Sequence, residues 1–106
     1  MILQNMGTIQ AEIGILPIGT DSTSLGKYIA KAIKSLKNID GIKYQVTPMG
    51  TMLESDDIDK IFLASKALSN TLFEMGVMRV ETILKIDERR DKKRTLEDKL
   101  ASIKEK

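Results

Sequence analysis

The sequence predicts an α+β fold: a four-stranded antiparallel sheet, two helices on one of its faces and an extra helix at the C-terminal end. Three observations lead to this prediction. Four segments alternate apolar and polar residues with a period of two, which is typical of half-buried strands. Two further segments carry apolar residues at helical spacing. These segments follow one another in the order strand, helix, strand, strand, helix, strand.

The first strand is predicted over residues 9–16, where isoleucine and alanine alternate with more polar residues before a proline and a glycine end the run. Residues 1–18 contain Glu12 and have no basic region, so we interpret them as a frayed start and a strand rather than a targeting segment. Residues 19–24 are rich in helix-capping types. A helix with one apolar face follows over residues 25–36.

The next two strands, over residues 43–47 and 51–54, are joined by the turn Pro48-Met49-Gly50 and form a hairpin. Aspartates directly after the hairpin suit the N-terminus of a second helix, and Gly76 suits its end. One face of this helix is predicted to hold Ile58, Ile61, Phe62, Leu68, Leu72 and Met75.

The fourth strand is predicted over residues 80–86, and a charged turn over 87–94 leads to a short helix over 95–104. Thr95, with Asp98 three residues later, resembles a capping box. The complete order is β-α-β-β-α-β with a terminal helix, which is the ferredoxin-like arrangement.

This order leaves one face of the sheet open. We expect one domain over residues 1–106, with its core at about 8–87 and the charged turn and C-terminal helix at 88–106. The alternation places a mixed set of side chains on the open face: Gln10, Glu12, Leu16, Gln45, Thr47, Glu81, Ile83 and Lys85. Such a face suits a partner subunit, a ligand, or both.

The composition narrows the possible functions. Cysteine and histidine are both absent, which removes the usual thiolate nucleophile, general base and zinc ligands. We therefore expect neither enzymatic activity nor a metal or cofactor. The absence of cysteine fits a reducing compartment, and no apolar run reaches the length of a membrane span. The expected location is the cytoplasm.

Nucleic-acid binding is not expected. The net charge is +2, and although residues 85–106 carry +3, their acidic residues dilute the field. RNA-binding domains with this strand order need exposed aromatic residues on the sheet. Here Tyr28, Phe62 and Phe73 fall on predicted helices, and Tyr44 falls on the core side. An acylphosphatase is also excluded, because no glycine-rich anion loop carries an arginine near the N-terminus.

Three groups of residues could carry chemistry, and each has a plainer interpretation. The loop from Gly19 to Lys27 has the wrong spacing for a P-loop and is better interpreted as a helix cap, with a weak anion site as the alternative. Glu12, Glu54 and Glu81 could contact a cationic ligand or form salt bridges between subunits. The charged run at 85–92 is either a solvated turn or part of an assembly or anion site.

Several short segments, in a fixed order, resemble segments of a known protein family. They are Ala11-Glu12 with Pro17 to Thr20, Pro48 to Thr51 with Glu54, Gly76-Val77 with Arg79-Val80, Lys85 to Asp87, Arg90 to Lys92, and Thr95, Glu97 and Lys99. Together they resemble the small thiamine-binding protein family, related to the YkoF-like domains, over about Thr8 to Ile103. Where a glycine often follows the hairpin glutamate in that family, this chain has Ser55, which is a good helix cap.

The resemblance implies a ferredoxin-like protein that assembles through its sheets into a homodimer or homotetramer. It also implies non-catalytic binding of thiamine or its hydroxymethylpyrimidine part, with a carboxylate to offset the thiazolium charge. The expected polar contacts are Glu12, Thr47, Thr51 and Glu54, with Gly19 and Thr20 at the border of the site. The apolar contacts would come from Leu16, Met49 and Met52.

The alternative is an oligomeric regulatory or interaction protein that binds an anion or another metabolite. The loop from Gly19 to Ser24 and the basic residues Lys85 and Arg90 would then form the anion or interface site. Both hypotheses predict an oligomer, because an open face that carries Leu16 and Ile83 would make a poor monomer surface.

Overall fold

The computed structural model describes residues 8–91 and 94–104. Its strands are β1 (Ile9–Ile18), β2 (Lys43–Thr47), β3 (Gly50–Ser55) and β4 (Arg79–Glu88). Its helices are α1 (Gly26–Lys34), which continues into the 3₁₀ turn η2 (Ser35–Asn38), α2 (Ile58–Glu74) and α3 (Leu96–Lys104). The frayed start expected before Thr8 lies outside the described residues.

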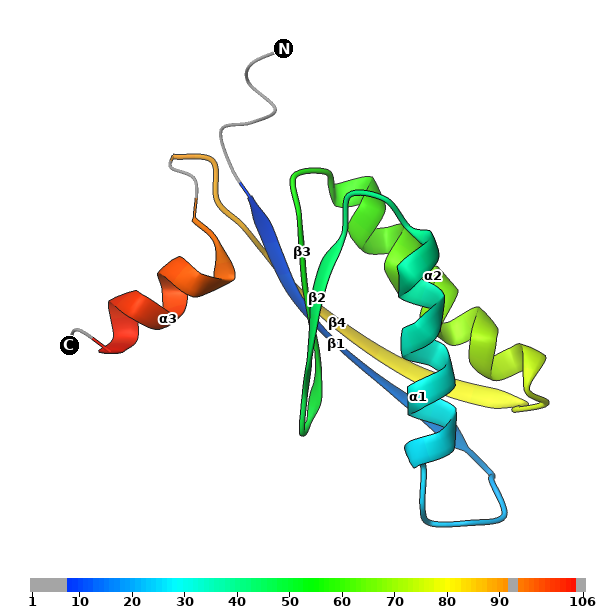
Figure 1. Cartoon of the computed structure of the whole chain (residues 1–106). Helices are drawn as coiled ribbons and strands as arrows, with labels where there is room; N and C mark the ends of the chain where they lie inside the picture. Colours follow the sequence, from blue (N-terminus) through cyan, green and yellow to red (C-terminus); the bar gives the residue numbers. More distant parts are fainter. Residues whose placement is uncertain (1–7, 92–93, 105–106) are drawn as a thin grey trace.

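The strands form one antiparallel sheet in the order β2-β3-β1-β4. Figure 1 shows α1 and α2 on one face of this sheet and α3 on the opposite side. This is the arrangement that the βαββαβ order predicts, so the α+β fold with its extra C-terminal helix is confirmed. Within the described ranges, no helix is long and apolar enough to cross a membrane.

The core lies between the sheet and the two covering helices, as the two periodicities predict. The largest fully buried side chains are Leu36, Leu53, Ile61, Leu68 and Leu72. The sequence places Phe62 on the buried face of α2, and this is wrong, because 52% of Phe62 is exposed. Phe62 follows the fully buried Ile61, so its side chain points about 100° away from the core around the helix.

Side-chain hydrogen bonds fix the start of α2. Asp57 is the N-cap and accepts a hydrogen bond from the N–H of Asp59 at 2.9 Å. Ser55 Oγ in turn accepts one from the N–H of Asp57 at 3.1 Å. These bonds satisfy donors that the first turn of a helix leaves free.

The start of α1 differs from the prediction of a helix cap in the loop from Gly19 to Ser24. The helix follows Leu25 and has no side-chain cap. The hydroxyl of Thr20 donates to the carbonyl of Ser22 at 2.8 Å, and Ser22 Oγ accepts from the N–H of Ser24 at 2.9 Å. The capping residues are therefore used inside the loop, one turn before the helix begins.

The β2–β3 hairpin is shorter than β1, and this difference shapes the sheet. β4 pairs with β1 over all of Ile9–Ile18, but β3 pairs with it only from Ile9 to Ile13. Beyond Ile13, β1 is an edge strand on its hairpin side. Pro17 lies in this edge portion, where a missing N–H is tolerated.

The predicted capping box at the start of α3 is confirmed. The N–H of Thr95 donates to the Asp98 carboxylate at 2.9 Å, and the N–H of Asp98 donates to Thr95 Oγ1 at 3.0 Å. No residue of α3 is buried. Leu100 and Ile103 are 54% and 70% exposed, so the helix presents apolar side chains to its surroundings.

Candidate ligand-binding site

A groove of about 450 Å³ lies where α1, the free edge of β1 and the tip of the hairpin meet. Leu25, just before α1, with Ile29 and Ile33 of α1, forms one wall, and the hairpin tip around Pro48 and Met49 forms the other. The floor is β1 from Ile13 to Leu16. Its volume is in the range of small-molecule sites, and its walls are mainly apolar, as such sites usually are.

The free edge of β1 offers backbone hydrogen-bonding groups to this groove. A Cβ added to Gly50 would lie 3.1 Å from the carbonyl oxygen of Ile13, so that carbonyl points toward the hairpin. In an antiparallel sheet the N–H and C=O of one residue point to the same side, and the side alternates along the strand. Ile15 therefore directs its N–H and C=O toward the same side, where the hairpin has already ended.

Two threonine hydroxyls are the polar side chains of the groove. Thr47 Oγ1 donates to the carbonyl of Gly50 at 2.7 Å and accepts from its N–H at 3.1 Å, which closes the hairpin turn. Thr51 is buried in β3. None of the described residues that line the groove carries an ionisable side chain. The groove thus combines apolar walls, hydroxyls and one backbone donor–acceptor pair.

The structure divides the residues that the sequence singled out between three places. Thr47 and Thr51 line the groove, together with Leu16 and Met49. Gly19 and Thr20 lie in the loop after β1 and do not line it. Met52 lies opposite Glu12 in the sheet, on the open face rather than in the groove.

None of the predicted carboxylates is among the described residues that line the groove, although Glu12 Cγ would lie 3.6 Å from a Cβ added to Gly50. Glu12 lies on the open face of the sheet, where its carboxylate is 3.8 Å from Lys85 Nζ. Glu81 is exposed on the same face, opposite Leu16. Glu54 is buried and accepts a hydrogen bond from the N–H of Leu96 at 2.8 Å. Glu54 therefore binds α3 to the sheet.

The structure does not bring together the residues of the expected anion site, which are the loop at Gly19, Lys85 and Arg90. The loop follows Ile18, and Arg90 lies just beyond Glu88, the partner of Ile9, so they sit at opposite ends of β1. Ten strand residues separate these ends by roughly 30 Å. Arg90 forms an exposed ion pair with Glu88 at 3.1 Å.

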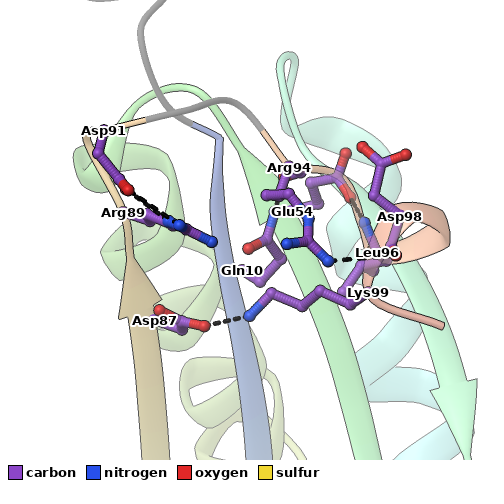
Figure 2. Close-up of polar contacts among 9 residues, drawn as sticks. All are labelled: Gln10, Glu54, Asp87, Arg89, Asp91, Arg94, Leu96, Asp98 and Lys99. Carbon is purple, nitrogen blue, oxygen red and sulfur yellow. Dashed lines mark hydrogen bonds and ion pairs between the residues drawn. The ribbon is translucent and has the colours of Figure 1, made fainter. Parts of the chain in front are cut away.

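A second cavity, of about 290 Å³, lies between the open face of the sheet and α3. Gln10 of β1 and Asp87 of β4 form its floor, and Arg89, Arg94 and Lys99 lie around it (Figure 2). We call it the basic cleft. A hydrogen bond from Lys99 lowers the pKa of the Asp87 carboxyl.

Sequence reasoning anticipated Leu16 in the groove and an anion role for the charged run at 85–92, but it missed the free backbone edge of β1 and the cleft that gathers Arg89, Arg94 and Lys99. The groove could have been anticipated from strand lengths, because β1 has 10 residues whereas β2 and β3 have 5 and 6. The cleft leaves no such signal. Its cations come from the charged turn and from α3, and only the docking of α3 onto the sheet gathers them.

Comparison with known proteins agrees with the resemblance seen in the sequence. The model of a family described as thiamine-binding protein matches residues 11–104. A UPF0045 protein of Methanothermobacter thermautotrophicus is 46% identical over 98 residues, which cover 92% of this chain and 98% of the relative. The UPF0045 protein YqgV of Bacillus subtilis is 41% identical and covers 88% of this chain and 91% of its own length.

Solved structures agree with the fold. The hypothetical protein MJ1052 of Methanocaldococcus jannaschii superposes with a TM-score of 0.80 at 44% identity, over 93% of this chain and 98% of that one. A Thermotoga maritima protein provisionally assigned to thiamine biosynthesis or salvage superposes with a TM-score of 0.73 at 26% identity, over 91% of this chain and 98% of its own.

Proposed function

We propose that this chain, which belongs to the thiamine-binding protein family, binds thiamine or its hydroxymethylpyrimidine part in the groove between α1 and the hairpin tip. The strand register carries the choice of this site: β3 stops pairing with β1 at Ile13, so the alternation along β1 turns the N–H and C=O of Ile15 toward a mainly apolar groove. An aminopyrimidine presents the matching pair, because its amino group donates and the adjacent ring nitrogen accepts. The ring would thus extend the sheet as a short strand does.

The rest of the groove supports a flat and partly apolar ligand. Leu25 and Ile29 on one side and Met49 on the other can pack against the two faces of an aromatic ring. Thr51, which pairs with Ile13 in the sheet, adds a hydroxyl to the lining of the groove. The thiazolium ring would lie toward the mouth, where carbonyl oxygens of the β1 edge offset its charge.

The proposed ligand is not phosphorylated. The described lining of the groove contains no lysine or arginine, so a phosphate group would gain no charge-assisted hydrogen bond there. Thiamine and hydroxymethylpyrimidine should therefore bind at least as tightly as thiamine diphosphate.

The binding is proposed to be non-catalytic. General acid–base or nucleophilic catalysis needs an ionisable group within hydrogen-bond reach of the ligand. The chain has no histidine or cysteine, and the part of the groove lining that the structure describes has no ionisable side chain of any kind.

We further propose that the protein is a homodimer or homotetramer that associates through the open face of the sheet. Ile83 is 67% exposed on β4, the edge strand of that face, and α3, which carries the exposed Leu100 and Ile103, lies on the same side of the sheet (Figure 1). A mixed face with exposed apolar side chains among charged ones can pair with its own copy across a two-fold interface.

Calorimetric titration of the ligand-stripped protein with thiamine, hydroxymethylpyrimidine and thiamine diphosphate tests the function. We expect saturable binding of the first two, with the amides of Gly14 and Gly50 shifting in a parallel NMR titration. Absence of heat with all three ligands, on a fully assembled protein, would overturn the proposal.

A further inference from the structure

The basic cleft gathers three cationic side chains from separate parts of the chain. Arg89 follows β4, Arg94 precedes α3, and Lys99 lies on α3. One carboxylate, Asp87, lines the cleft with them. The described lining therefore carries an excess of positive charge in a concave site, which focuses the field on small anions.

Two of these cations already have partners. Lys99 forms an ion pair with Asp87, and Arg89 forms one with Asp91, whose carboxylate lies outside the cleft lining. Both pairs are visible as dashed contacts in Figure 2. Because these side chains are held in place, their remaining N–H donors are oriented before any ligand arrives.

Arg94 differs from the other two cations. In the described parts of the chain it forms no direct salt bridge, and one Nη donates to the carbonyl of Asp98 at 3.3 Å. Its charge also contributes, at longer range, to lowering the pKa of the Asp98 carboxyl. A guanidinium group has five N–H donors, so most of those of Arg94 are unused. The side chain is half-buried. A cation in this state favours an anionic partner with several acceptor oxygens.

Gln10 holds Arg94 in position. It is buried in β1, with 3% exposed, and its Nε2 donates to the backbone carbonyl of Arg94. This bond joins the turn before α3 to the floor of the cleft, 84 residues away in sequence. The cleft is therefore built on a strand of the sheet rather than on a loop alone.

We propose that the basic cleft is a binding site for a small oxyanion, either inorganic phosphate or the phosphate group of a small metabolite, held by Arg94 and Lys99. The site is separate from the groove. Its cations lie around Gln10, near the start of β1, whereas the groove begins at Ile13 and lies beyond the hairpin tip. Loss of thiamine binding would leave this inference untouched.

The test is an NMR titration of the ¹⁵N-labelled protein with inorganic phosphate at constant ionic strength. The Gln10 side-chain amide and the backbone amides of Lys99 and Ser102 report on the cleft. Wild type should show saturable shifts there. Arg94→Gln should weaken phosphate binding by roughly tenfold or more. Asp87→Asn should tighten it several-fold, because it removes a negative charge and releases Lys99.

The matched control is Lys104→Gln, which also removes one positive charge but at a residue of α3 outside the cleft lining. It should leave the phosphate affinity unchanged. Shifts that do not saturate, or equal affinities for Arg94→Gln and Lys104→Gln, would overturn the proposal. A second titration with glycerol phosphate separates the two sources. If glycerol phosphate binds more tightly than inorganic phosphate, the ligand is the phosphate group of a metabolite. If it binds equally or more weakly, the ligand is the free ion.

Discussion

The carboxylate of Glu54 accepts a hydrogen bond of 2.8 Å from the backbone N–H of Leu96, 42 residues away in the sequence. The bond joins β3 to the first residue of α3, and it is supported by an ion pair of 2.7 Å between Lys43 and Glu97. Since no residue of α3 is buried, these polar contacts largely determine where the helix lies. They also explain why a buried carboxylate near the hairpin need not be a ligand contact.

Replacing Glu54 with alanine should release α3 without affecting the groove. A hydrogen bond to a charged group contributes about 1–3 kcal/mol, so we expect a loss of that order in the free energy of unfolding. Hydrogen exchange should accelerate in residues 96–104, whereas thiamine affinity should be unchanged. Glu81→Ala, which removes an exposed carboxylate from the same face, is the control. A large loss of thiamine affinity in Glu54→Ala alone would place Glu54 in the site after all.

Alanine at Gly50 should disturb the hairpin. The added Cβ would lie 3.1 Å from the carbonyl oxygen of Ile13, and a backbone atom cannot move aside as a flexible side chain can. Overpacking of this kind costs about 1–3 kcal/mol, which urea denaturation would measure. Gly14→Ala is the matched control, because nothing lies within 4 Å of its added Cβ. Equal stability of the two variants would contradict the close approach.

A charge placed at Val46 should change the affinity for cationic thiamine but not the affinity for neutral hydroxymethylpyrimidine. Val46 lines the groove and is 54% exposed, so a charged residue can be accommodated there. Val46→Lys should weaken binding of the cationic thiamine by about fivefold or more, and Val46→Glu should strengthen it, since charges at close range interact by several kcal/mol before solvent screening. Hydroxymethylpyrimidine should respond little to either change.

The control for Val46 is Phe62→Lys on the outer face of α2, where the exposed fraction is similar at 52%. Calorimetry of all three variants with both ligands gives the comparison. If thiamine affinity is the same in Val46→Lys and Val46→Glu, the thiazolium ring does not lie at the mouth of the groove.

A charged residue at Ile83 should dissociate the proposed oligomer. Ile83 is 67% exposed on the edge strand β4 of the open face, so Ile83→Lys costs the isolated subunit little. Light scattering should give a multiple of 11.8 kDa for wild type and 11.8 kDa for the variant. A wild-type protein that is already 11.8 kDa would refute association through this face.

Acid should detach α3 before the core unfolds. The hydrogen bond from Lys99 lowers the pKa of Asp87, and the one from Lys43 lowers the pKa of Glu97. A carboxyl whose folded-state pKa is lowered contributes stability above its ordinary pKa and loses it as the pH falls through the lowered value. We therefore expect exchange in residues 96–104 to rise below about pH 4, while the amides of Ile61 to Leu72 stay protected. Loss of exchange protection at the same pH in α3 and in the amides of Ile61 to Leu72 would contradict this order of unfolding.

The sequence alone was sufficient for the elements and their order. Alternation in β1 and β4, the turn at Pro48 to Gly50 and the cap at Asp57 are local signals, each set by a few neighbouring residues. The whole set of side chains predicted for the open face follows from the same period of two, and the strand register agrees with it.

What only the tertiary structure decided is which residues meet. The groove exists because the hairpin stops pairing with β1 at Ile13, which leaves Ile15 without a β3 neighbour. The roles of Glu54 and Arg94 depend on where α3 docks. Periodicity tells which face a side chain occupies, but strand register and helix docking arise from packing between residues far apart in the chain. No local pattern encodes those distances.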